Sequence, residues 1–302
     1  MISDAEARAK ARAALISVIS NLALTTLKAL TGVFTLSVSI LSEALHSGLD
    51  LVAAVMALVA VRRSRVPADA DHNFGHGKIE SLSGLAEGAL ILVAVGMILW
   101  TAVRRMALGD VGIREPMVGA AVMGVSAVVN VFVSRMLFRV ARRTESVALE
   151  ADAWHLRTDV WTSAGVLCAM AIIAVGTRLG LHEVHHLDPL IAIGVALVIT
   201  RAAWDIMRRS YDHLMDRSLP QQEVAKIAAL LEDHYPELTE FHRLRTRRAG
   251  PQRYVDLHVV VPGGRSVAEA HALSDHLEDD LQALLPNLEV MIHVEPREET
   301  DH

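Results

Sequence analysis

Two histidine–aspartate pairs with the same spacing lie inside long apolar stretches of the sequence. They are His46 with Asp50 and His155 with Asp159. A four-residue spacing puts both side chains of a pair on one face of a helix, about one turn apart. Two imidazoles and two carboxylates form a ligand set suited to tetrahedral Zn²⁺. Together the pairs predict a four-ligand metal site.

The apolar surroundings place this site at membrane depth. An aspartate at the centre of a bilayer costs about 2.5 to 3.5 kcal/mol on insertion scales, so each carboxylate should face a polar interior and a partner. A lone intramembrane histidine or aspartate often only hydrogen-bonds a neighbouring helix, and that alternative stays open for any one residue. The repetition of the pair favours the metal site.

Composition favours a membrane protein. The chain has 302 residues, 52% of them hydrophobic but only 4% aromatic, and its mean hydropathy is +0.34. Cys168 is the single cysteine, which excludes a disulfide framework within the chain and a cysteine-rich metal site, and we interpret it as a small buried hydrophobe. The net charge of −6, with no basic patch with interleaved aromatic residues, argues against a nucleic-acid partner.

Six apolar windows have the length of a membrane span. They are Ala13–Val33, Ser37–Val61, Ile79–Val103, Met117–Phe138, Ala148–Val175 and Leu187–Met207. We expect a six-helix transmembrane domain over residues 1–208, embedded in the lipid bilayer, and a cytoplasmic domain over residues 209–302.

Lysine and arginine are concentrated before the first window and after the even-numbered ones, which predicts that both termini are cytoplasmic. The charged first residues lack a small-residue cleavage site, so we interpret them as a cytoplasmic lead into the first helix. The absence of a transit peptide favours a bacterial inner membrane.

The C-terminal part alternates between helix and strand patterns. We expect helices over Gln221–Asp233 and from a Ser266 cap to about Leu285, with Glu269 at the capping-box position. Strands are expected over Glu240–Arg247, Tyr254–Val261 and Asn287–Glu295, the second with Val255, Leu257, Val259 and Val261 on its apolar face and Tyr254, Asp256 and His258 opposite. This α-β-β-α-β order predicts a small α+β, metallochaperone-like sandwich, which oligomerisation would help to stabilise.

A polar loop between the second and third windows holds three further candidate ligands. Asp69, His72 and His76 fall within eight residues, next to glycines that allow a tight turn. A solvated loop without metal remains the alternative.

These stretches in this order resemble the cation diffusion facilitators, dimeric transporters that exchange Zn²⁺ and related divalent ions for protons. The resemblance covers nearly the whole chain and rests on SVSI at Ser37, PADADHNFGHGKIES at Pro67, ALEADAWHLRTDVWTS at Ala148, LDP at Leu187, MDRSLP at Met215, FHRLRTRRAG at Phe241 and MIHVEP at Met291.

The resemblance assigns the transport site to His46, Asp50, His155 and Asp159. Many bacterial members have Asp in place of His46, and with His the set is similar to that of zinc-selective animal members. Two imidazoles and two carboxylates favour Zn²⁺ or Co²⁺ over Mn²⁺, whereas Fe²⁺ and Cd²⁺ cannot be ranked from sequence.

The resemblance also implies regulatory Zn²⁺ sites and a homodimer. One site corresponds to Asp69, His72 and His76. Another, between cytoplasmic domains, corresponds to His242, His258, His271, His293 and Glu295, where the family often has Asp in place of Glu295. A solvated surface histidine stays the alternative for each of these. Lys78 and Asp216 match a charge pair that links the two membrane domains in relatives.

We therefore expect proton-coupled efflux of Zn²⁺ by alternating access, with His155 as the first choice of proton carrier and His46 as the second. The alternatives are a membrane-embedded metalloenzyme and a metal sensor. No HExxH motif, separate general base or serine or cysteine nucleophile supports an enzyme. His182, His185 and His186 are interpreted as a solvated loop, and His213, His234, His276 and His302 receive no assignment.

Overall fold

The computed structural model describes residues 4–35, 38–108, 116–178, 187–233 and 238–297, except for the side chains of residues 4, 38–39, 42, 101–102, 105–108, 116–120, 166–178 and 187–192. The candidate residues Cys168, His182, His185, His186, His234 and His302 lie outside this description. The chain divides into two compact units, one over Ala5–Tyr211 and one that contains Asp212–His302.

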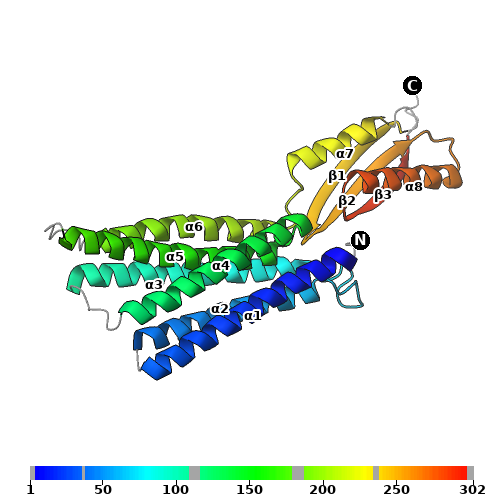
Figure 1. Ribbon diagram of the computed structural model, residues 1–302. Coiled ribbons are helices and arrows are strands. Elements are labelled where there is room, and N and C mark those ends of the chain that lie inside the picture. The colour runs from blue at the N-terminus through cyan, green and yellow to red at the C-terminus, as the bar shows by residue number, and fades with distance from the viewer. Residues whose placement is uncertain (1–3, 36–37, 109–115, 179–186, 234–237, 298–302) are drawn as a thin grey trace. The chain divides into compact units, whose positions relative to one another are not determined.

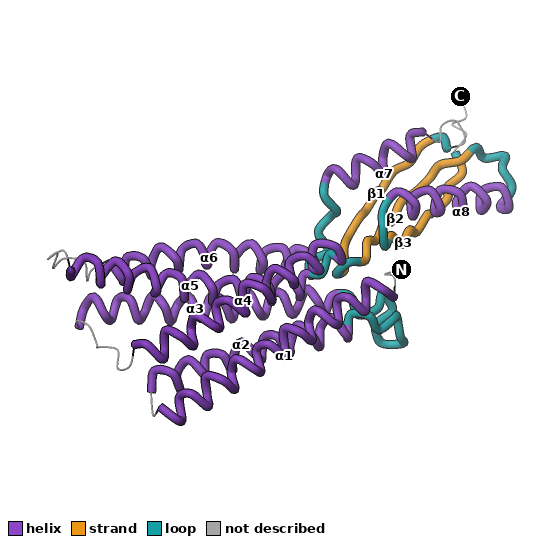
Figure 2. The backbone as a smooth tube through the Cα atoms, viewed as in Figure 1, coloured by secondary structure: helices purple, strands orange, loops and turns teal. Residues whose placement is uncertain are grey.

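Six long helices make up the first unit (Figures 1 and 2). They are α1 (Asp4–Thr35), α2 (Val38–Arg63), α3 (Lys78–Leu108), α4 (Pro116–Thr144), α5 (Val147–Arg178) and α6 (Leu187–Leu214). Within the residues that the structure describes, four stretches are long and apolar enough to cross a membrane: Ala5–Thr35, Glu43–Arg63, Lys78–Trp100 and Ala121–Thr144. They match the first four expected windows. The last two windows fall on α5 and α6 and extend into the side chains that are not described.

The N-terminal lead differs from its expectation. Helix α1 begins at Asp4, and Lys10 is almost fully buried instead of standing free in solvent. Its ammonium group forms an ion pair with Glu80 of α3, and Glu80 also accepts hydrogen bonds from the hydroxyls of Ser64 and Ser146. Burial of a charged pair is tolerated where further hydrogen bonds satisfy its lone pairs, as they do here.

Helix α5 is the central packing element of this unit. One apolar cluster joins it to α1, α2 and α4 through small and branched residues such as Ala14, Leu137 and Leu156. A second cluster joins it to α3 and α6 and includes Ile91, Ala151 and Ile199. Alanines at the contacts let the helix backbones approach closely, as is typical of membrane bundles. The residues on α5 are therefore held from several sides.

Two glycines one turn apart allow α3 to pack closely on its neighbours. A Cβ atom at Gly84 would lie 2.6 Å from Oγ of Ser210, and one at Gly88 would lie 2.5 Å from Cγ of Met207, both on α6. Gly-x-x-x-Gly is the spacing that brings two membrane helices into close contact. By contrast, a Cβ at Gly96 on the same helix would meet nothing within 4 Å.

The second unit is an α+β sandwich with the expected element order. It consists of α7 (Gln221–Asp233), β1 (Glu240–Ala249), β2 (Gln252–Val261), α8 (Val267–Leu284) and β3 (Leu288–Pro296). The sheet order is β1-β2-β3, with β1 antiparallel and β3 parallel to β2. A parallel neighbour needs a crossover connection, which α8 provides.

The core of this sandwich lies between the sheet and both helices. Val255, Leu257 and Val259 of β2 pack with Ile227 of α7 and Leu277 of α8 in one cluster. The capping box at the start of α8 is confirmed, with Ser266 and Glu269 bonding each other's backbone amides.

Tyr254 lies on the face of β2 opposite the valines, as expected, but it is covered there and only 7% exposed. The Arg247 guanidinium lies 4.0 Å from the centroid of its ring, and this cation–π contact covers the ring.

Candidate metal site

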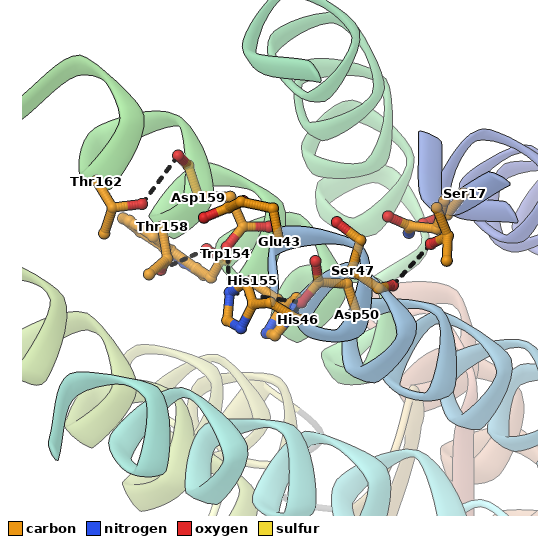
Figure 3. A network of polar contacts seen from close by, with 12 residues as sticks. Ser17, Glu43, His46, Ser47, Asp50, Trp154, His155, Thr158, Asp159 and Thr162 are labelled. Atoms are coloured by element: carbon orange, nitrogen blue, oxygen red, sulfur yellow. Dashed lines mark hydrogen bonds and ion pairs between the residues drawn. The ribbon is translucent and has the colours of Figure 1, made fainter. Parts of the chain in front are cut away.

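The two histidine–aspartate pairs come together between α2 and α5 (Figure 3). The Nε2 atom of His46 lies 4.0 Å from Oδ1 of Asp50, one turn later on α2, and 4.0 Å from Oδ1 of Asp159 on α5. One ligand atom from each of the three residues lies within 4.8 Å of the others. Three of the predicted ligands thus form a group that could hold a metal ion.

His155 joins this group through Asp50. Its Nε2 atom lies 3.0 Å from Oδ1 of Asp50, while its Nδ1 atom is buried without a hydrogen-bond partner. The i, i+4 spacing on α5 places His155 and Asp159 on the same helix face, toward the matching pair on α2. The structure therefore brings all four predicted residues into one polar cluster.

Three of these four side chains are largely removed from water, so the negative charges of the two carboxylates need compensation. The side chains of Asp50 and His155 are 6% and 8% exposed, and that of Asp159 is 19% exposed with Oδ2 lacking a hydrogen-bond partner. His46 is 39% exposed and is the most open of the four. Two carboxylates out of water need a cation nearby, since an uncompensated buried charge is strongly destabilising. A divalent ion bound by both carboxylates would supply that charge.

Lys28 on α1 is a neighbour that the sequence revealed only as a polar interruption of an apolar window. It is buried, and its Nζ atom donates to Oγ of Ser47 at 2.7 Å and lies 3.4 Å from Oε2 of Glu43. Its charge acts on both Asp50 and Asp159. A fixed ammonium group is thus part of the electrostatics of the cluster.

Sequence reasoning also missed two buried carboxylates, Glu87 on α3 and Asp152 on α5. Both are 0% exposed. Oε1 of Glu87 accepts a hydrogen bond from Ser83 at 2.9 Å, whereas its Oε2 has no partner. Neither carboxylate oxygen of Asp152 has a hydrogen-bond partner among the described residues. The signal in the sequence was an acidic residue within each apolar stretch, with Asp152 at helical spacing, three residues before His155.

The loop ligands also cluster. Nδ1 of His72 lies 3.3 Å from Oδ1 of Asp69, and Nε2 of His76 lies 3.6 Å from Oδ2 of the same carboxylate. Gly75 adopts φ +73°, the left-handed conformation that lets the loop turn back between the two histidines. Nδ1 of His76 faces the Val66 carbonyl at 3.3 Å, an arrangement that commonly fixes the tautomer of a metal ligand.

The pKa of Asp69 is lowered chiefly by a hydrogen bond from the backbone amide of His72. This keeps the carboxylate ionised, the form that a metal ligand requires. The three side chains thus form a compact N₂O group on an exposed loop.

The C-terminal unit brings His242, His258 and Glu295 into a third group. His242 and His258 are directly paired across β1 and β2, and His258 and His293 across β2 and β3. Oε1 of Glu295 lies 2.7 Å from Nδ1 of His258, and Oε2 lies 3.3 Å from Nε2 of His242. The hydrogen bond from His258 lowers the pKa of Glu295.

The other two predicted tail ligands are placed differently. Nε2 of His293 lies 3.6 Å from Oε1 of Glu295, at the margin of the group. His271 lies on α8, where it is 75% exposed and contacts Asp275 at 3.4 Å. Within one chain His271 therefore stands apart from the sheet ligands, and its membership of this site stays a prediction.

The expected charge pair between Lys78 and Asp216 also stays a prediction. The two residues belong to different compact units. Within its own unit, Oδ1 of Asp216 lies 3.6 Å from Nη1 of Arg247.

Comparison with known proteins supports this architecture over both units. Residues 14–215 match the cation efflux transmembrane domain, and residues 219–297 match the cytoplasmic domain of cation efflux proteins. The chain is 36% identical over 263 residues to the uncharacterized transporter sll1263 of Synechocystis, covering 87% of this chain and 83% of the relative. It is 30% identical over 289 residues to the cation-efflux pump FieF of Salmonella paratyphi A, covering 96% and 93%.

A solved structure, the metal-bound C-terminal domain of the CzcD transporter from Thermotoga maritima, is 30% identical. It covers 28% of this chain and 100% of that one, with a TM-score of 0.25. The match to the transmembrane family domain over more than half of the chain shows what kind of protein this is. The chain belongs to the cation diffusion facilitator family, and it is a cation-efflux transporter of the membrane rather than an enzyme.

Proposed function

We propose that this protein exports Zn²⁺ from the cytoplasm in exchange for protons and that the ion binds at His46, Asp50, His155 and Asp159. The observation that supports this most is the convergence of two imidazoles and two carboxylates from α2 and α5 in one buried cluster. A mixed nitrogen and oxygen ligand set suits Zn²⁺ and Co²⁺ better than metals that prefer only oxygen. Fe²⁺ and Cd²⁺ are the other ions to be compared.

The contact between His155 and Asp50 accounts for the exchange with protons. At 3.0 Å, a protonated Nε2 of His155 can donate to Oδ1 of Asp50. A metal ion needs the lone pair of that nitrogen, so binding must displace the proton. Proton and Zn²⁺ therefore alternate at the same atoms, and inward proton flow drives metal outward.

Rocking of the helices would expose this site alternately to the two sides of the membrane. We place both termini in the cytoplasm and the protein in a bacterial inner membrane as a homodimer. The loop group at Asp69, His72 and His76 and the tail group at His242, His258, Glu295, His293 and His271 would bind cytoplasmic Zn²⁺ as regulatory sites.

The test is Zn²⁺ uptake into proteoliposomes under an imposed pH gradient. Uptake that follows the gradient in the wild type should be lost in Asp50→Ala and Asp159→Ala. Asp205→Ala is the matched control, because Asp205 is also a carboxylate on a helix of the bundle but is exposed and paired with Arg201. Uptake that survives both site variants would place the transport site elsewhere.

A further inference from the structure

A cavity of about 650 Å³ between α4 and α5 is lined almost entirely by arginine and aromatic side chains. Its lining residues are Arg135, Phe138, Arg139, Arg142, Arg143, Trp154, Arg157 and Trp161. The sequence predicted no basic patch with interleaved aromatic residues. The cluster was not recognised because its arginines and Phe138 lie on α4, whereas Arg157 and the two tryptophans come from α5.

The arginines of this cavity lack acidic partners. Among the side chains that the structure describes, none of the five guanidinium groups forms an ion pair or a hydrogen bond with a carboxylate. Elsewhere arginines find partners, as Arg209 does with both carboxylate oxygens of Glu150. The net charge of the chain is −6, so acidic residues are not scarce. The cavity therefore concentrates positive charge that the chain itself leaves uncompensated.

Arg157, the least exposed arginine of the cavity, has a buried nitrogen that lacks a hydrogen-bond acceptor. Nε of Arg157 is buried and has no hydrogen-bond partner, while its guanidinium carbon lies 5.6 Å from the centre of the Phe138 ring. The Phe138 ring also packs edge-on against Trp154, at 5.2 Å between centroids. A buried guanidinium nitrogen without an acceptor costs free energy that an anionic oxygen would recover.

The arginines of α4 are spaced to receive one ligand. Arg135, Arg139, Arg142 and Arg143 follow an i, i+4, i+7, i+8 pattern and so share one helix face. They extend from the last turn of α4 to about 13 Å before its end, at a rise of 1.5 Å per residue. In the expected six-helix topology α4 and α6 cross the bilayer in the same direction, so these arginines lie on the membrane side on which α6 ends.

We propose that this cavity binds the phosphate headgroup of an anionic phospholipid in the leaflet on the side of the C-terminal domain. Basic pockets between membrane helices on that side suit anionic headgroups, and guanidinium groups bind phosphate oxygens in pairs. Phe138, Trp154 and Trp161 give the cavity an apolar wall for the glycerol and upper acyl chain, which a free phosphate ion does not need. The membrane side rests on the proposed orientation with both termini cytoplasmic.

Two tryptophans in the cavity wall allow a direct test. In a Trp100→Phe/Trp204→Phe background, the remaining tryptophans are Trp154 and Trp161, because the chain has four in total. The full-length protein is reconstituted in nanodiscs that contain brominated phosphatidylglycerol or brominated phosphatidylcholine, and quenching of tryptophan fluorescence measures which lipid lies beside the cavity. We expect stronger quenching by the anionic lipid.

Two double variants distinguish specific lipid binding in the cavity from general attraction of anionic lipids to surface arginines. Arg142→Gln/Arg143→Gln should lower the preference for the anionic lipid about five-fold or more, the change produced by about 1 kcal/mol per basic residue near a charged membrane surface. Arg62→Gln/Arg63→Gln is the matched control, because these arginines also form an adjacent exposed pair in the last turn of a membrane helix but lie outside the cavity. The control should keep the preference.

Three results would overturn the proposal. They are equal quenching by the two lipids, an equal loss in both double variants, and loss of the preference on adding inorganic phosphate at matched ionic strength, which would mean that the cavity takes free phosphate. These measurements are made without Zn²⁺ and without a pH gradient. A failure of metal transport therefore leaves them interpretable, and their failure leaves transport untouched.

Discussion

Nε2 of His155 lies 3.0 Å from Oδ1 of Asp50, so one contact joins a proposed ligand on α5 to a proposed ligand on α2 across 105 positions of sequence. The same two atoms are the ones that a bound metal ion would use. A proton held between them and a metal ion bound to them are mutually exclusive. The geometry thus links metal binding, proton binding and the packing of two helices.

This exclusion predicts that Zn²⁺ affinity falls as the pH is lowered. Below the pKa of an imidazole the proton occupies its nitrogen, so the metal must displace it, and the apparent dissociation constant rises. In the range from about pH 8 to about pH 5, where histidine commonly titrates, calorimetry on the detergent-solubilised protein should show this rise. His155→Gln should bind Zn²⁺ more weakly at high pH and show a smaller pH dependence. An unchanged pH dependence in that variant would exclude His155 as the proton carrier.

The buried charge of Lys28 should oppose metal binding. Lys28→Gln removes a positive charge that acts on Asp50 and Asp159 but keeps an amide that can donate to Ser47. Repulsion between a buried ammonium group and a nearby divalent cation is worth on the order of 1 kcal/mol or more, so Zn²⁺ affinity should increase about five-fold or more. Titration with a competing chelator measures this. Lys226→Gln, on the surface of α7, should have no effect, and weaker binding in Lys28→Gln would show that the lysine supports the site.

The close approach of α3 and α6 predicts a sharp difference between two glycines of one helix. A Cβ at Gly84 would lie 2.6 Å from Oγ of Ser210 and 2.9 Å from Cγ1 of Val147, whereas one at Gly96 would meet nothing within 4 Å. Gly84→Val should therefore lower stability by about 1 to 3 kcal/mol, the usual range for overpacking. Gly96→Val is the control, since it adds the same side chain to the same helix. Thermal unfolding followed by size-exclusion chromatography compares them, and equal Tm values would contradict the packing.

The second unit should lose stability in acid through one ion pair. Nε and Nη2 of Arg253 donate to the two carboxylate oxygens of Glu223, at 2.9 Å and 3.1 Å, and this lowers the pKa of Glu223. A carboxyl whose pKa is lower in the folded state stabilises the fold above its unfolded pKa, about 4.3, and this stabilisation is lost as the pH falls through the folded value.

Glu223→Gln should therefore destabilise a fragment of residues 212–302 by about 1 to 2 kcal/mol at pH 7, because Arg253 is left buried with a weaker acceptor. The difference from wild type should shrink once the pH is below the folded pKa. Urea unfolding at several pH values measures it. Asp279→Asn, on the exposed side of α8, should change little at any pH, and a pH-independent difference for Glu223→Gln would exclude the linkage.

The clustering of the two histidine–aspartate pairs on α2 and α5 could be predicted from the sequence because two simple rules coincide at them. The helical period puts the members of each pair on one face, and the cost of charge in a bilayer forces both faces inward. The α8 capping box was predictable for a similar reason, since Ser266 and Glu269 act within one turn. The spacing of residues within a helical turn and the free-energy cost of burying charge in a bilayer can both be recognised from the sequence alone.

Contacts between segments that lie far apart in the sequence could not be predicted in this way. Lys10 was interpreted only as part of the cytoplasmic lead, and its burial was not foreseen because its partner, Glu80, is 70 positions away. Glu87 and Asp152 are both fully buried, and although Asp152 lies at helical spacing from His155 and Asp159, that relation was not used. The arginines of α4 looked like a sign of membrane orientation alone, and only the contact with α5 places them around one cavity.

The most direct test of proton-coupled transport is to impose a Zn²⁺ gradient and to measure whether it moves protons. Proteoliposomes with a pH indicator inside receive a Zn²⁺ gradient and no initial pH gradient, and both ions are recorded together. Exchange at the His155–Asp50 contact predicts that Zn²⁺ entry drives protons out, so the interior becomes alkaline, and that both signals vanish in Asp50→Ala but not in Asp205→Ala. Zn²⁺ entry without any change of internal pH would contradict the proposed coupling.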